Sequence, residues 1–209
     1  MFVDFTKTAP QERYKLLTAT VIPRPIALVS TQGTDGTLNA APFSFFNVFS
    51  EDPALAVLGF EDRRDNDRLK DTTRNIKETN ALVINLVDHA LGPAMAACAT
   101  ALDPGESEFG FAGLTPAPSH HINVPGIAEA PVRLECRLFE LRQITERRHL
   151  CIAEILALHA REGIIDPQSF YVDLAAYRPL GRLFGNSYFD VTQSFDIPVP
   201  PRPEKEPSI

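Results

Sequence analysis

Strand-like runs dominate this chain and place the tightest limit on its fold. Apolar residues recur at every second position in Pro131–Glu140, and a second long strand pattern covers His149–His159. Alternation with a period of two is typical of a strand with one buried and one exposed face. Ala54–Phe60 is apolar throughout, which predicts a strand buried on both faces or nearly so. Ala81–Val87 predicts one more strand.

Turn residues join a further pair of strands near the amino terminus. Gly33, Asp35 and Gly36 separate Ile26–Thr31 from Leu38–Phe46. Glycine and aspartate in a short connection between two β-rich runs indicate a β-hairpin. We therefore expect these two segments to pair as antiparallel neighbours.

Helical patterns are short and few. We expect helices or helical turns over Thr8–Leu17, Asp67–Thr79 and Leu91–Ala101. Because strands and hairpin signals outnumber them, the prediction is a mainly β fold, an antiparallel β-barrel with attached helices. No GxGxxG sequence follows a strand, which argues against a Rossmann domain.

The chain length of 209 residues suits one domain with a sizeable core. We expect a single domain over residues 1–197 and a proline-rich tail over residues 198–209. The tail is typical of a polyproline-like or disordered arm, either loose or packed against a partner subunit. Asp103–Pro125 is rich in glycine, proline and serine, which predicts an excursion outside the core.

Composition excludes several classes of function. The net charge of −7 argues against nucleic acid as the main partner, because phosphate binding requires a basic face. No apolar stretch reaches the length of a membrane span, and the amino terminus lacks an apolar signal core. Cys98, Cys136 and Cys151 share no CxxC spacing, which is typical of reduced thiols in a cytoplasm. We expect a cytoplasmic protein, with Cys136 and Cys151 buried in the core.

The segment NAAPFSFFN, Asn39–Asn47, is the first candidate for a binding site. Pro42 removes a donor from the strand ladder, and Ser44 and Asn47 offer hydroxyl and amide groups close by. Such groups, with free backbone donors, suit the edge of a heteroaromatic ring. Flat apolar walls would come from Phe43, Phe45 and Phe46. The alternative is a strand end with core phenylalanines.

The segment KDTTRN, Lys70–Asn75, is the second candidate. If Asp71, Thr72 or Thr73 begins a helix, its N–H groups and the positive end of the helix dipole can receive a phosphate. Charge-assisted hydrogen bonds would come from Lys70, Arg63 and Arg64. The alternative is a capped surface helix with solvated charges.

Other polar residues have weaker rationales. His149 begins a strand pattern, so it could donate to a bound ring or carry a proton, or be a satisfied structural residue. His120 and His121 are adjacent and lack metal-ligand spacing, so no metal site is expected. In LGRLFGNSY, Leu180–Tyr188, two glycines would allow a ligand close to the backbone and Arg182 could reach an anion; the alternative is a plain turn.

Taken in order, these segments resemble the flavin reductase-like family, whose members have an FMN-binding split barrel. The motifs that carry the resemblance are RPIALVST, DGTLNAAPFSFFN, the DP pair at Asp52–Pro53, KDTTRNI, VIN, HLCIAEI and LGRLFGNSY. Each motif is weak alone, but their order and spacing extend over most of the chain.

The resemblance implies a homodimer that holds FMN near the subunit interface and takes electrons from NAD(P)H. It implies His149 as the catalytic residue, close to the flavin or the nicotinamide, and LGRLFGNSY as a loop that closes over the cofactor. The implied cofactor-binding residues are Arg24, Thr31, Ser44, Phe45, Asn47, Arg63, Lys70, Asp71, Thr72, Asn75, Arg182 and Tyr188.

Three functions follow from this reading. The first is an NAD(P)H-dependent flavin reductase, with an acceptor such as a monooxygenase left open. The second is an FMN-binding electron-transfer protein without its own NAD(P)H turnover. The third is an oxidase acting on a phosphorylated pyridine, which would need a second anion pocket.

Overall fold

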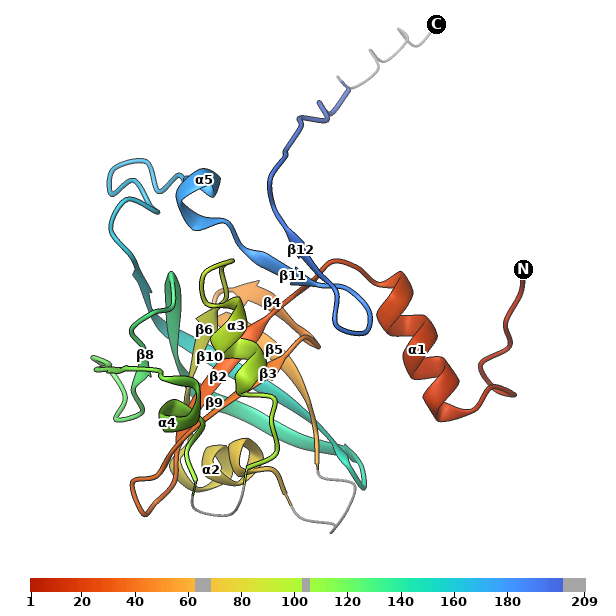
Figure 1. Cartoon of the computed structure of the whole chain (residues 1–209), viewed down its shortest axis with the longest axis horizontal. Helices are drawn as coiled ribbons and strands as arrows, with labels where there is room; N and C mark the ends of the chain where they lie inside the picture. Colours follow the sequence, from red (N-terminus) through yellow and green to blue (C-terminus); the bar gives the residue numbers. More distant parts are fainter. Residues whose placement is uncertain (63–68, 103–105, 201–209) are drawn as a thin grey trace, which may run out of the picture.

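A computed structural model describes residues 1–62, 69–102 and 106–200. Its centre is a seven-stranded sheet in the order β3-β2-β6-β9-β10-β5-β4, curled into a barrel (Figure 1). All neighbouring strands pair antiparallel, so the predicted antiparallel β-barrel is confirmed. The strands are β2 (Ala27–Gln32), β3 (Leu38–Phe43), β4 (Phe46–Glu51), β5 (Ala54–Glu61), β6 (Ala81–Leu86), β9 (Val132–Thr145) and β10 (Arg148–Ala160).

Burial along the strands follows their residue patterns. β5 alternates between buried and half-buried positions, so its outer face is less covered than its apolar sequence predicts. β6 is buried over nearly its whole length because it lies inside the sheet between β2 and β9. β9 and β10 form the longest pair; the second half of β9 is largely exposed, whereas the second half of β10 is mostly half-buried.

The barrel is split between its edge strands β3 and β4. The sequence predicts one strand over Leu38–Phe46, but the strand is interrupted after Phe43. Phe43 pairs with Ala27 on one edge of the sheet, whereas Phe46 pairs with Leu58 on the other. The chain therefore crosses the split at Ser44 and Phe45, which separates the side chains on either side of this crossing.

Helices cover the ends and one side of the barrel. α2 (Asp71–Thr79) closes one end and inserts Ile76 into the main core. α3 (Gly92–Ala97), shorter than predicted, and α4 (Glu108–Ala112) pack over β2 and β3 around a second apolar cluster. α4 gives the predicted excursion a helical turn. α1 (Pro10–Thr20) projects from the body of the molecule (Figure 1), and Thr18 is its buried residue.

Two small sheets complete the fold. β1 (Arg24–Pro25), β11 (Leu180–Arg182) and β12 (Tyr188–Asp190) form one of them, and β7 (Pro116–Ala117) pairs with β8 (Gly126–Ile127). The predicted terminal loop is thus largely a hairpin, which we call the terminal hairpin (residues 180–190). A short helix, α5 (Leu174–Tyr177), precedes it.

Gly181 in this hairpin serves chain packing. A Cβ atom at this position would lie 2.6 Å from Cβ of Pro23, so the glycine allows β11 to approach the segment before β1. From the sequence, we expected this glycine to let a ligand lie close to the backbone, whereas in the structure Gly181 lets another part of the chain lie there. Gly185, at the tip, has a φ of 55°, which glycine adopts without strain.

The cysteines are buried thiols. Cys136 and Cys151 lie in the main core with no exposed surface, as predicted. Burial raises the pKa of Cys151 to about 12, so the thiolate is disfavoured at neutral pH. Among the described residues, no helix combines the length and apolar character needed to cross a membrane.

Candidate functional site

The first turn of α2 begins at the rim of a cleft. Lys70 is the N-cap residue in extended conformation, and within the described residues its side chain makes no capping hydrogen bond. The first N–H groups of a helix lack partners inside the helix, and they carry the positive end of its dipole. The predicted helix start at KDTTRN is therefore confirmed, and it offers donors to an anion.

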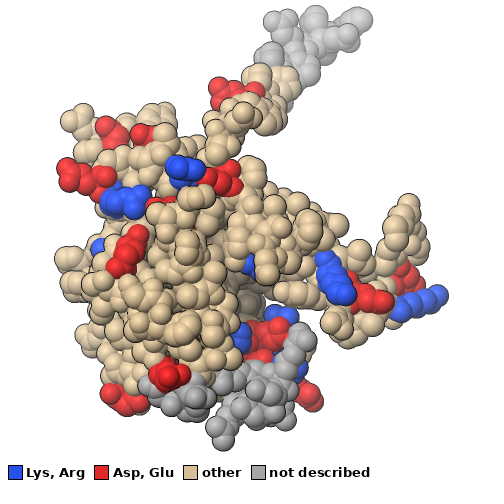
Figure 2. Space-filling view, viewed as in Figure 1, with Lys and Arg blue, Asp and Glu red and all other residues tan. Residues whose placement is uncertain are grey.

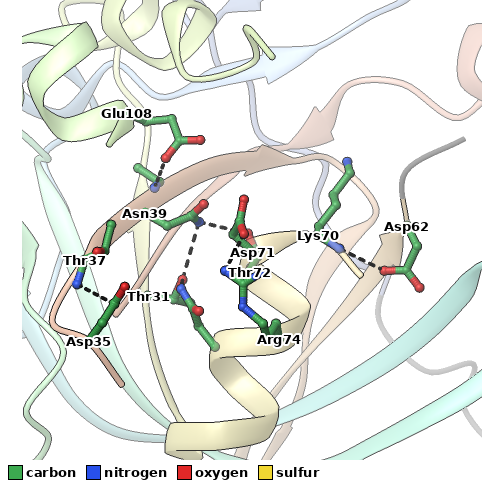
Figure 3. Close-up of polar contacts among 12 residues, drawn as sticks. Thr31, Asp35, Thr37, Asn39, Asp62, Lys70, Asp71, Thr72, Arg74 and Glu108 are labelled. Atoms are coloured by element: carbon green, nitrogen blue, oxygen red, sulfur yellow. Dashed lines mark hydrogen bonds and ion pairs between the residues drawn. The ribbon is translucent and has the colours of Figure 1, made fainter. Parts of the chain in front are cut away.

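A buried polar network holds this helix start in place (Figure 3). The amide nitrogen of Asn39 donates to Oγ1 of Thr72 at 3.0 Å and lies 3.4 Å from Oγ1 of Thr31. Asn75 also donates to Oγ1 of Thr31, at 3.1 Å. All four residues are buried. Thr31 and Asn75 therefore anchor α2 to β2 and β3.

Thr72 and Lys70 line a cleft of about 300 Å³, which we call the lysine cleft. Its other walls come from β3, from the first residue of α2, from the segment after α3 and from α4: Asn39, Ala41, Pro42, Asp71, Cys98, Ala99, Thr100, Ala101 and Glu108. Glu108 accepts a hydrogen bond from the backbone N–H of Ala40 at 3.2 Å, which fixes α4 against β3 (Figure 3). Asp71 is paired with Arg74 at 2.5 Å, which partly offsets its negative charge.

A second cleft of about 320 Å³ adjoins the first, because Pro42 and Ala99 line both. We call it the arginine cleft. Its lining comprises Tyr14, Arg24, Ile26, Pro42, Phe43, Ser44, Met95, Ala96, Ala99, Arg182, Asn186 and Tyr188. The ammonium of Lys70 lies 5.7 Å from the ring centroid of Phe43, so a cation stands near the junction of the two clefts.

Arg24 fastens the elements around the arginine cleft to one another. Its guanidinium donates to the backbone carbonyls of Thr18 at 2.5 Å, Val21 at 3.1 Å and Leu183 at 2.8 Å. Its Nε lies 3.3 Å from Oγ of Ser44. Burial lowers the pKa of Arg24 from its ordinary value. Arg24 therefore holds α1, the terminal hairpin and the β3–β4 crossing together.

Arg182 and Tyr188 form the hairpin wall of the same cleft. The guanidinium of Arg182 stacks 4.5 Å from the ring centroid of Tyr188 and donates to its hydroxyl and to the carbonyl of Gly185. A stacked guanidinium keeps its charge while one face is shielded from water. The hairpin thus presents an aromatic and cationic surface.

Phe45 and Asn47, like the network residues Thr31 and Asn75, line neither cleft. The ring of Phe45 packs 6.2 Å from that of Tyr14 and lies under Arg148, at 5.6 Å. Asn47 lies past the β3–β4 crossing, where its side chain accepts from the backbone N–H of Val48 at 2.9 Å. It lines a separate apolar groove of about 200 Å³. The crossing therefore leaves Ser44 in the arginine cleft and places Phe45 and Asn47 outside both clefts.

His149 is buried, with 3 % of its surface exposed, and lines neither cleft. Its Nδ1 lies 3.2 Å from Oδ2 of Asp62, although neither ring nitrogen has a directed hydrogen bond among the described residues. The structure does not bring His149 together with the other predicted site residues. Arg63, the remaining candidate, lies outside the described residues, as does Arg64.

Several lining residues were not predicted from the sequence. Asn39 stands in the motif that drew attention to β3, yet its amide is the hub of the network below the lysine cleft. Tyr14, Cys98 and Glu108 come from segments distant in sequence, so no local pattern points to them, whereas Asn186 belongs to the predicted LGRLFGNSY loop. Within the described residues, no group of three or more His, Cys, Asp or Glu side chains is arranged to hold a metal ion.

Known proteins are similar to this chain in sequence and in fold. The family model of the flavin reductase like domain matches residues 19–180. The protein YwrF of Bacillus subtilis is 39% identical over 192 residues, which cover 90% of this chain and 93% of the relative.

Two solved structures are also similar. The 2-nitrobenzoate 2-nitroreductase NbaA of Pseudomonas fluorescens is 34% identical with a TM-score of 0.88, and 96% of each chain is covered. Nitrilotriacetate monooxygenase component B of Bacillus cereus is 31% identical, also with a TM-score of 0.88, over 94% of this chain and 98% of that one. The chain, with its split antiparallel barrel, belongs to the flavin reductase-like family.

Proposed function

We propose that this protein binds FMN along the two adjoining clefts and uses NAD(P)H to reduce it. The observation that carries the proposal is the first turn of α2, which opens into a cleft that continues into an aromatic, cationic compartment. Membership in the flavin reductase-like family supports a flavin as the ligand.

The lysine cleft suits the phosphate of FMN. Backbone N–H groups at a helix start and a nearby ammonium are the donors that phosphates prefer. Lys70 and Thr72 both line this cleft, and the Asn39 network keeps the helix start rigid. A preorganised donor set costs little reorganisation when the ligand binds.

The arginine cleft suits the ring. Phe43, Tyr188 and Pro42 provide flat or apolar walls, and Ser44 and Asn186 provide groups that could meet ring carbonyls and nitrogens. Each cleft has the size of a small-molecule pocket, and their shared residues make one continuous path. The hairpin wall at Arg182 and Tyr188 would cover the ring on one side.

A bound flavin would supply the hydride-accepting and electron-donating chemistry. The chain's own part would be to bind the flavin and nicotinamide rings in reacting orientation and to set the charge around them. Arg182 and Lys70 would favour negative charge on the bound ligand. The described lining of the arginine cleft contains no Asp, Glu, His, Lys or Cys side chain, so we assign its residues to binding.

We also propose that the protein works as a homodimer. Apolar side chains near the clefts are exposed: Tyr14 and Leu17 on α1, Phe111 on α4 and Phe184 in the terminal hairpin. The face over α3 and α4 carries few charged side chains (Figure 2). A second copy could cover this surface and bring the flavin near the interface.

The acceptor of the reduced flavin is a further part of the proposal. One relative is component B of a monooxygenase and another is a nitroreductase. We propose a separate acceptor, such as a monooxygenase, for electrons that leave the flavin. A dependence on NAD(P)H fits a cytoplasmic location.

Purified protein tests the proposal directly. We expect the fluorescence of FMN to be quenched when it binds. We also expect NADH or NADPH to be oxidised only when FMN is present, as measured by the loss of nicotinamide absorbance. Tight FMN binding without oxidation of either nucleotide would instead favour the electron-transfer role. A protein that binds no flavin would contradict both.

A further inference from the structure

His149 and Asp62 form a buried polar contact outside both clefts. The Nδ1 atom of His149 lies 3.2 Å from Oδ2 of Asp62, and their side chains are 2% and 6% exposed. His149 stands opposite Phe60 in the β10–β5 register, so the imidazole lies at the core side of the sheet. Burying a carboxyl group in such surroundings is costly unless a polar partner faces it.

Asp62 connects this contact to the start of α2. Its Oδ1 accepts the backbone N–H of Lys70 in a long hydrogen bond of 3.4 Å (Figure 3). Its own backbone N–H donates to the carbonyl of Arg147 at 2.9 Å, and the Arg147 guanidinium donates to its carbonyl at 3.1 Å. One carboxylate therefore joins the beginning of β10 to the residue that precedes the helix.

We infer that His149 and Asp62 are positioning residues that set where the first turn of α2 presents its N–H groups, and so select a phosphorylated flavin over an unphosphorylated one. This inference rests on the proposed function, because it names a determinant of specificity for the same site. His149 acts through Asp62, which holds the backbone of Lys70, and it has no contact with the ligand.

The geometry explains why specificity for phosphate would depend on this pair. The side chain of Lys70 points away from Asp62 (Figure 3), so Asp62 binds the backbone and leaves the ammonium directed elsewhere. Hydrogen bonds to a phosphate depend steeply on donor distance and angle. A small displacement of the helix start would weaken those bonds, whereas a ring in the arginine cleft would be unaffected.

The test compares FMN with riboflavin, which lacks the phosphate. Dissociation constants for both flavins are measured by fluorescence quenching for the wild type, Asp62→Ala, Asp62→Asn, His149→Ala and the Asp62→Ala/His149→Ala double variant. Glu154→Gln is the matched control, because it breaks the ion pair between Glu154 of β10 and Arg137 of β9, which does not involve the first turn of α2. Thermal melting verifies that each variant is folded.

We expect Asp62→Ala to weaken FMN binding about tenfold, the effect of one lost hydrogen bond of this kind, and riboflavin binding less than about twofold. Asp62→Asn should recover most of the affinity, since its amide oxygen can still accept from Lys70. His149→Ala should weaken FMN selectively, and the double variant should be no worse than Asp62→Ala alone, because the two residues act as one unit. Glu154→Gln should bind both flavins like the wild type.

Other results would overturn the inference. Equal losses for FMN and riboflavin would mean that the pair supports the fold in general, and unchanged FMN binding in folded His149→Ala would mean that His149 has no part. If Asp62→Ala fails to fold, His149→Ala and Asp62→Asn are compared with the wild type instead, by the ratio of their dissociation constants for FMN and riboflavin. A wild-type protein that binds neither flavin would contradict the proposed function. A wild-type protein that binds FMN while the variants show no selective loss would contradict only the inference.

Discussion

The amide nitrogen of Asn39 donates to Oγ1 of Thr72 at 3.0 Å, and this bond joins β3 to the first turn of α2 inside the protein. Both residues are buried at the floor of the lysine cleft, so removing one partner leaves the other with a poorly satisfied polar group. The two motifs that suggested a ligand site in the sequence are thus in direct contact.

Asn39→Ala should destabilise the fold by about 1–3 kcal/mol, because the hydroxyls of Thr72 and Thr31 lose a buried donor. Urea unfolding measures the change. Asn186→Ala in the exposed terminal hairpin is the control and should change stability little. Wild-type stability of folded Asn39→Ala would show that the network is energetically neutral.

Lys70→Ala should weaken FMN binding about tenfold or more and leave riboflavin binding nearly unchanged, since a charge-assisted bond to the phosphate is lost. Lys77→Ala, in the last turn of the same helix, changes the net charge equally at the far end of the helix. Flavin fluorescence titrations of both variants distinguish a local contact from long-range attraction. Similar losses in the two variants would contradict a phosphate site at Lys70.

Arg24→Lys should weaken the binding of both flavins without discriminating between them. A lysine cannot reproduce the bonds from one guanidinium to the carbonyls of Thr18, Val21 and Leu183, so the walls of the arginine cleft should separate. FMN and riboflavin should weaken together, and unfolding free energy should fall by about 2–4 kcal/mol. Calorimetric binding and chemical unfolding measure the two effects, with Lys15→Ala on the exposed side of α1 as the control.

Gly181→Ala should destabilise the terminal hairpin, because the new Cβ would lie 2.6 Å from Cβ of Pro23. Either β11 or the segment before β1 would have to move to relieve this contact. Overpacking of this kind costs about 1–3 kcal/mol. Gly110→Ala in α4 is the matched control, since its added Cβ meets no atom within 4 Å and alanine favours a helix. Limited proteolysis at the hairpin and thermal melting would detect the difference.

Glu135 should give the fold part of its acid sensitivity. Burial raises the pKa of this carboxyl, but hydrogen bonds from the N–H groups of His121 and His120 and from the His159 ring outweigh it, so the net pKa is lowered. The folded state therefore binds its proton less readily than the unfolded chain does. Its stabilisation is present above the ordinary pKa of 4.5 and is lost as the pH falls through the lower folded value.

Urea unfolding between neutral pH and pH about 3 tests this sign. Glu135→Gln should be less stable than the wild type at neutral pH by about 1–3 kcal/mol, and the difference should shrink on acidification. Glu154→Gln, which removes a carboxylate from an exposed pair, should keep the wild-type pH dependence. A constant difference across the pH range would show that the Glu135 charge is not involved.

Local features were predicted well because their causes are local. Alternation in β9 and β10, the turn residues between β2 and β3, and the start of α2 each follow from neighbouring residues. The burial of Cys136 and Cys151 follows equally from the apolar runs around them. The order of motifs along the chain was sufficient to indicate the family.

Long-range contacts decided the rest of the site. Arg24 donates a hydrogen bond to the carbonyl of Leu183, 159 positions away, and so joins β1 to the terminal hairpin. The crossing at Ser44 and Phe45 depends on which sheet edge each flanking strand joins, so sequence proximity alone grouped Ser44 with Asn47. The backbone preferences of single residues and the spacing of apolar residues act over a few positions. These local properties were enough to predict the strands and the start of α2. Which side chains share a cleft depends on how the barrel closes, and that is set by packing among segments that no local pattern relates.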